Sequence, residues 1–133
     1  MRSVTILAVL SAGALWASAS TAQPGNRPVR VGLAGADLDA CLSLAEVQGL
    51  DPNGDNFLTV RAAPSREARA LDRLGPGQQV WVCEESPGWS GIVYATRRNR
   101  QCNVGSPVPR PRPYAGACRQ GWVASRYLVT IAG

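Results

Sequence analysis

The side chains that could do chemistry in this 133-residue chain are 14 arginines, nine acids and four cysteines. The sequence contains no histidine and no lysine. Ser–His, Cys–His and Ser–Lys pairs, Schiff-base lysines and histidine-ligated metals all require residues that the chain lacks. The adjacent acids Glu84 and Glu85 cannot flank one glycosidic bond, because neighbouring residues of a strand point to opposite faces. The composition therefore predicts a binding protein that is not an enzyme and uses no cofactor or metal.

The arginines are unevenly distributed along the chain. No acid follows Glu85, and seven arginines do: Arg97, Arg98, Arg100, Arg110, Arg112, Arg119 and Arg126. The six arginines from Arg27 to Arg73 share their part of the chain with all nine acids. Planar guanidinium groups bind carboxylates and phosphates in a bidentate manner. We therefore expect a basic lobe beside an acidic one, with five candidate ligand contacts: Arg97, Arg98, Arg100, Arg110 and Arg112. The alternative is that these charges serve only solubility.

Prolines alternate with valine and arginine from Pro107 to Pro113, inside a segment that spans residues 96–120. Every second φ angle is fixed in such a pattern, which favours stiff, extended polyproline geometry. Only Tyr114 in this segment could stack on a base, so nucleic acid is not expected as a partner.

The start of the chain has the pattern of a secretory signal peptide. Arg2 precedes an apolar run from Val4 to Trp16, which is short for a membrane span, and small residues follow through Ala22. We predict a signal peptide over residues 1–22, with Ala19 as a second choice of cleavage site and a retained membrane anchor as the alternative. No membrane span is expected after its removal. This predicts a secreted or periplasmic protein.

Four cysteines in a small exported domain predict disulfides, although sequence alone allows three pairings. Cys102 and Cys118 flank a single proline-rich stretch, so we expect them to pair, which leaves Cys41 for Cys83. A zinc site or a free redox thiol is the alternative, but the spacing contains no C-x-x-C motif.

Short strands are predicted for most of the chain that follows. Residues 57–61 alternate apolar and polar side chains, and a Pro87-Gly88 turn joins 80–83 to 89–94 as a hairpin. Residues 121–123 form another strand, 125–128 a short helical turn, and 129–131 a last strand. Residues 65–74 are expected to be a loop with at most one turn, and residues 23–40, rich in Gly, Pro and Asp, a flexible lead-in. The predicted fold is all-β: a small barrel of five to seven short antiparallel strands, stabilised by two disulfides.

Four sequence blocks resemble the bacterial SH3-like (SH3b) domain: LTVRAAPS at 58–65, LGPGQQVWV at 74–82, Gly88-Trp89, and Gly121-Trp122-Val123 with Tyr127-Leu128. The resemblance covers residue 57 to about 129, within a domain of residues 41–131. It implies a strongly bent antiparallel barrel, with residues 41–56 as an N-terminal addition and residues 96–120 as a basic insert where the family has a tight turn. Members of the family act as non-catalytic targeting modules of exported proteins, and many bind peptidoglycan peptides. This chain carries no catalytic domain to be targeted.

The aromatic residues divide into two groups. Phe57, Trp89 and Trp122 are expected in the core. Trp81, Tyr94 and Tyr127 are candidate ligand contacts, although Trp81 could instead cover the N-terminal addition and the two tyrosines could pack at the rim. The sequence thus predicts a cell-envelope binding module for peptidoglycan peptide or another anionic wall component. The alternative is a structural or regulatory protein that docks onto an envelope protein through its stiff insert.

Overall fold

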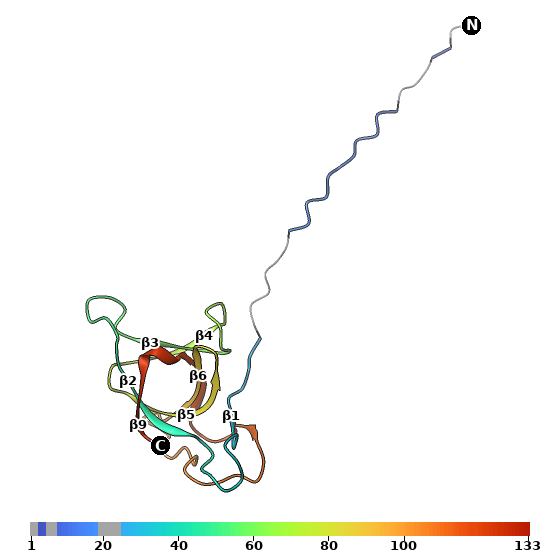
Figure 1. Cartoon of the computed structure of the whole chain (residues 1–133). Coiled ribbons are helices and arrows are strands. Elements are labelled where there is room, and N and C mark those ends of the chain that lie inside the picture. The colour runs from blue at the N-terminus through green and yellow to red at the C-terminus, as the bar shows by residue number, and fades with distance from the viewer. Residues whose placement is uncertain (1–2, 5–7, 19–24) are drawn as a thin grey trace.

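A computed structural model describes residues 3–4, 8–18 and 25–133. Residues 8–18 have no regular structure and lead away from the folded body (Figure 1). The expected cleavage sites after Ala19 and Ala22 lie outside the described residues. The body consists of antiparallel strands and one short 3-10 helix, η1 (Ser125–Tyr127), and the described residues contain no α-helix. The prediction of an all-β, antiparallel fold is therefore confirmed.

The main sheet has seven strands in the order β4-β3-β8-β6-β5-β2-β9 and curls round on itself (Figure 1). Its members are β2 (Ser43–Val47), β3 (Leu58–Arg61), β4 (Ala70–Leu74), β5 (Gln79–Ser86), β6 (Trp89–Tyr94), β8 (Arg119–Ala124) and β9 (Leu128–Ala132). The predicted hairpin is β5 and β6, and η1 leads into β9 as expected. Strands β4 and β9 are the two edges and do not pair with each other, so hydrogen bonding does not close the sheet.

Alternation along β5 creates a core on each side of the sheet. Val80 and Val82 belong to a cluster made by the main sheet alone, which we call the sheet core. Trp81 and Cys83 face a second cluster, the disulfide core, which contains all four cysteines. Successive strand residues point to opposite faces, so this arrangement follows directly from the sequence. The prediction that Trp81 faces away from the two valines is confirmed.

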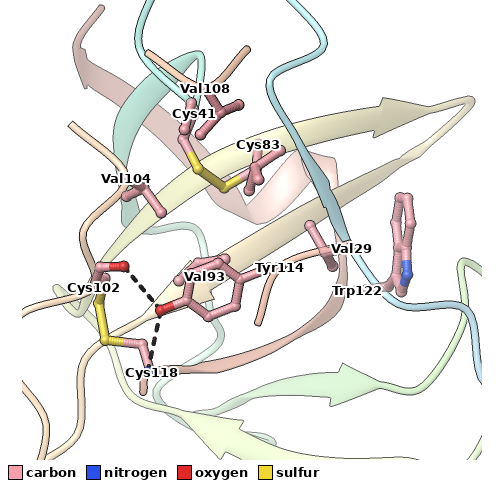
Figure 2. Close-up of a cluster of buried hydrophobic side chains, with 12 residues drawn as sticks. Val29, Cys41, Cys83, Val93, Cys102, Val104, Val108, Tyr114, Cys118 and Trp122 are labelled. Carbon is pink, nitrogen blue, oxygen red and sulfur yellow. Dashed lines mark hydrogen bonds between the residues drawn. A yellow bond between two sulfur atoms is a disulfide. The ribbon is translucent and has the colours of Figure 1, made fainter. Parts of the chain in front are cut away.

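Both predicted disulfides are present. Cys41 is bonded to Cys83 with a Cα–Cα distance of 4.0 Å, and Cys102 to Cys118 with 5.2 Å. Figure 2 shows both bonds within the disulfide core. The first ties the start of β2 to β5, and the second closes the Pro-rich insert.

The N-terminal part of the body is packed, contrary to the expectation of a flexible lead-in over residues 23–40. Strand β1 (Arg30–Val31) pairs with β7 (Arg112–Pro113) of the insert, and Val29 and Val31 are buried in the disulfide core. The N–H of Trp122 donates to the carbonyl of Arg27 at 2.8 Å. The prediction is wrong for this segment because two valines that flank one arginine cover an apolar face of the sheet.

Two further expectations are corrected. Residues 41–56 are not a mere addition, because β2 lies between β5 and β9 and is hydrogen-bonded to both. Residues 70–74 form edge strand β4, not a loop, because they pair with β3. In both cases tertiary pairing decides the structure of a short segment whose local signal is weak.

The insert folds onto the body as the lid of the disulfide core. Val104, Val108 and Tyr114 are buried in it, although all three belong to a segment of polar and proline-rich sequence. The hydroxyl of Tyr114 donates to the carbonyl of Cys102 at 2.9 Å and accepts from the N–H of Cys118 at 3.2 Å (Figure 2). The insert is thus anchored by a disulfide and by buried side chains, and it presents its arginines outward.

Gly121 of β8 lies where the sheet leaves no room for a side chain. A Cβ at this position would touch Val60 Cγ1 and would lie 2.9 Å from the carbonyl oxygen of Arg61. Strand pairing holds this backbone in place, since Arg61 pairs with Trp122. We expect Gly121→Ala to lower the free energy of unfolding in urea by about 1–3 kcal/mol, the usual range for overpacking. Gly105→Ala is the matched control, because no atom lies within 4 Å of its added Cβ; equal losses in both variants would contradict this explanation.

Candidate functional site

The structure does not bring Trp81, Tyr94 and Tyr127 together in one groove. Tyr94 is only 2% exposed and belongs to the sheet core, so the prediction that it contacts a ligand is wrong. Its hydroxyl donates to Asp72 Oδ2 at 2.9 Å. Burial and the Asp72 carboxylate raise the pKa of Tyr94 far above its ordinary value. Trp81 and Tyr127 are half-buried and line two different grooves.

The five predicted arginine contacts are all exposed: Arg97, Arg98, Arg100, Arg110 and Arg112. None of them is in an ion pair with another residue of 25–133. Arg119, by contrast, binds Asp72 Oδ2 at 3.1 Å. Although burial of Asp72 acts to raise its pKa, hydrogen bonds from the Arg73 N–H, Tyr94 and Arg119 lower it overall. Part of the expected basic lobe is thus neutralised within the fold, whereas the five arginines from Arg97 to Arg112 keep their charges exposed.

An open groove of about 680 Å³ is lined by Phe57, Trp89 and Tyr127. Phe57 directly precedes β3, Trp89 begins β6, and Tyr127 ends η1. The turn before Trp89 depends on Gly88, whose φ of 77° lies in the left-handed region that favours glycine. This turn reverses the chain between β5 and β6 and brings Trp89 to the end of the sheet, where the groove opens. We call this the aromatic groove.

From the sequence, Phe57 and Trp89 were expected in the core. Both are half-buried and line the aromatic groove, and Trp89 also packs against the disulfide core, so the expectation holds in part for Trp89. Trp122 is fully buried, as predicted, although it packs in the disulfide core. The signal that distinguishes these residues is position within the strand. Trp122 lies in the middle of β8, whereas Trp89 and Phe57 stand at strand ends, where fewer neighbours cover a side chain.

Charged residues of both signs surround the aromatic side chains. Arg61, Arg66 and Arg126 line the aromatic groove together with Asp51 and Asp55. The guanidinium of Arg126 lies over the ring of Tyr127, 4.7 Å from its centroid. This cation–π contact holds a positive charge beside an aromatic face.

The side chains of the aromatic groove offer two kinds of contact to a ligand. Aromatic faces bind the apolar parts of an extended peptide, and guanidinium groups bind its carboxylates in pairs of hydrogen bonds. Within the described residues, no group of three or more His, Cys, Asp or Glu is placed to hold a metal ion. The aromatic groove therefore combines aromatic faces with charged groups of both signs.

A second groove, of about 610 Å³, lies beside Trp81. Leu38, Leu42 and Leu44 line it, and Asp37 and Asp39 also contribute. Trp81 thus both covers the segment around Cys41 and lines a groove, which are the two roles considered for it from the sequence. Asp37 and Asp39 give this groove a negative charge, in contrast to the arginines of the aromatic groove and of the insert.

Glu84 is a buried carboxylate, 2% exposed, that fixes the N-terminal segment to the sheet. Its Oε1 accepts hydrogen bonds from Arg27 Nη2 at 3.0 Å and from Arg30 Nη2 at 2.8 Å and Nε at 3.1 Å. Its Oε2 accepts from the backbone N–H of Arg30 at 2.9 Å. Burial acts to raise the pKa of Glu84, but hydrogen bonds and charge from Arg30 and Arg27 outweigh it and hold the pKa below 4.5. Glu85, the next residue, is exposed, so the two acids do not form one site.

No protein-family model, curated protein or solved structure matches this chain. Among the described residues, no helix has the length and apolar character needed to cross a membrane.

Proposed function

We propose that this chain is an exported, non-catalytic binding protein of the bacterial SH3-like class. The supporting features are a strongly curled antiparallel sheet, two disulfides and the order of the sequence blocks, which fall on β3, β5, β6, β8 and η1. Disulfides persist in oxidising compartments, which favours a secreted or periplasmic location after removal of residues 1–22. The ligand is a peptidoglycan peptide or another anionic component of the cell wall.

The observation that carries this proposal is the meeting of Phe57, Trp89 and Tyr127 with three arginines in the aromatic groove. Wall peptides are extended and carry carboxylates, so they match both kinds of side chain. The exposed arginines of the insert add long-range attraction for an anionic polymer, which salt screens.

Co-sedimentation with purified cell-wall sacculi tests the proposal. We expect the purified protein to bind sacculi, and we expect Arg66→Ala combined with Arg126→Ala to weaken binding about tenfold or more, since each charge-assisted hydrogen bond contributes about 1.5–3 kcal/mol. Both side chains are exposed, so the fold should survive. Arg98→Ala combined with Arg100→Ala is the control, because it removes the same charge outside the groove.

The outcomes separate the two candidate functions. Binding that falls equally in both double variants would assign recognition to net charge instead of the aromatic groove. Absence of co-sedimentation would overturn the wall-binding proposal. The structural or regulatory alternative, in which the insert docks onto an envelope protein, would then be favoured by the five free arginines on a disulfide-anchored lobe.

A further inference from the structure

Strand β9 leaves one edge of the main sheet open. It pairs only with β2, and every residue from Val129 to Ala132 is exposed. Val129 and Ile131 are 46% and 43% exposed. An edge strand that presents unpaired backbone groups is a template for another extended strand. Neither backbone pairing nor side-chain packing is complete along β9.

The hydrogen-bonding direction along β9 follows from its partner strand. The N–H of Val47 donates to Gln78 O at 2.9 Å, and its carbonyl accepts from Gly77 N at 2.8 Å, both on the β5 side of β2. Leu128, which pairs with Val47, therefore directs its carbonyl to the open edge, while its N–H donates to Ser125 O. The direction alternates along an antiparallel strand, so Thr130 points both its N–H and its carbonyl outward.

The two edges of the sheet differ in their protection. Strand β4 contains Asp72 and Arg73, and its pairing with β3 is interrupted by a bulge next to Arg61. Charges and bulges are the devices by which proteins prevent edge pairing. Strand β9 reads Leu-Val-Thr-Ile-Ala, without a charge, a proline or a glycine. The pairing of β2 with β9 also has a register shift, between Leu44 and Ala45, so the two edges differ in charge and not in the presence of a bulge.

We propose that β9 pairs with β9 of a second copy of this chain, antiparallel about a twofold axis at Thr130. In this register Thr130 meets Thr130 at the axis, and Val129 lies opposite Ile131 of the other copy. Ile131 is the residue at the register shift between Thr130 and Ala132 in the pairing with β2. The outward N–H and carbonyl of Thr130 then form the central hydrogen-bonded pair. The flanking β-branched pairs are of the kind that stabilises antiparallel strands.

The second copy is favoured over a different partner because the strand is complementary to itself. A twofold axis places each residue opposite its symmetry mate or a near neighbour, so a charged residue near the axis would repel its own copy. Residues 127–133 contain no charge.

Sedimentation equilibrium of the purified protein tests the pairing. We expect a dimer at micromolar concentration, and at least a tenfold weaker dimer for Thr130→Pro and for Thr130→Arg. Proline removes an N–H that faces away from β2 and so leaves the β2–β9 pairing intact, whereas arginine sets like charges against each other across the axis. Ala115→Arg, an exposed position in the insert, is the control for added charge.

Cysteine cross-linking tests the register. In a hydrogen-bonded antiparallel pair the Cα atoms lie about 5.5 Å apart, within the range of a disulfide, so Thr130→Cys should form a covalent dimer under mild oxidation. Val129→Cys should not, because it faces Ile131. A protein that stays monomeric at high micromolar concentration, or a dimer that both Thr130 variants leave unchanged, would overturn the proposal. So would a monomer whose β9 edge pairs only with an extended segment of another protein.

Discussion

Replacing Cys41 and Cys83 together by alanine is expected to lower the free energy of unfolding by about 4 kcal/mol. The bond joins residues separated by 42 positions, and the chain-entropy model gives about 4 kcal/mol for a loop of that size. The same calculation gives about 3 kcal/mol for Cys102 with Cys118, which are separated by 16 positions. Urea unfolding followed by tryptophan fluorescence measures both values.

The comparison between the two double variants is the decisive part of this experiment. Both pairs of cysteines are buried in the disulfide core, so the small cavities left by alanine are similar and the difference comes from loop length. The dependence of stability on urea should also steepen in both variants, because an uncrosslinked unfolded chain exposes more surface. A larger loss for Cys102→Ala with Cys118→Ala would show that anchoring of the insert, and not loop entropy, dominates.

The parts of the fold that sequence reasoning predicted correctly depend on neighbouring residues. The alternation around Trp81 and the turn before Trp89 are local patterns, and they determined the β5–β6 hairpin and both of its faces. The disulfides followed from counting, since closing the insert left a single remaining pair. The short η1 was also predicted, as a helical turn over residues 125–128.

The parts that were missed depend on contacts between distant residues. Strand β1 has only two residues, which is too few for any periodicity, and it is held by Glu84, 54 positions after Arg30. The burial of Val104 and Val108 likewise requires a partner surface that the proline pattern does not indicate. Such segments are ordered by what covers them, and composition alone makes them resemble linkers.

In the candidate site, too, some residues could be predicted from their sequence neighbours, and others depend on contacts with distant residues. Tyr127 was a candidate because it follows Arg126, and it does line the aromatic groove. Tyr94 was misjudged because its hydroxyl finds Asp72, 22 positions away, and the ring can therefore be buried without an unsatisfied polar group. Whether a tyrosine is a core residue or a ligand contact depends on that partner, which only the folded structure reveals.

Replacing Glu84 by alanine should release the N-terminal segment and lower the free energy of unfolding by about 3 kcal/mol. Removing one member of a buried ion pair costs about 3–5 kcal/mol. The lower end applies here because the side chains of Arg27 and Arg30 are 46% and 49% exposed, so their guanidinium groups regain water. Hydrogen exchange should quicken first at residues 27–32. Glu85→Ala, at the exposed neighbouring position, is the control and should change stability little.

The pH dependence of stability tests whether the charge of Glu84 stabilises the fold. Because the pKa of Glu84 in the folded protein lies below its ordinary value of 4.5, the pair stabilises the fold fully above that pH. This contribution is lost as the pH falls from 4.5 through the lower folded pKa, when the carboxylate is protonated and the arginines lose their acceptor. Glu84→Gln should remove that part of the acid dependence while keeping the shape of the side chain. An unchanged acid unfolding curve would mean that the arginines hold the segment by packing, and that the buried charge contributes nothing to it.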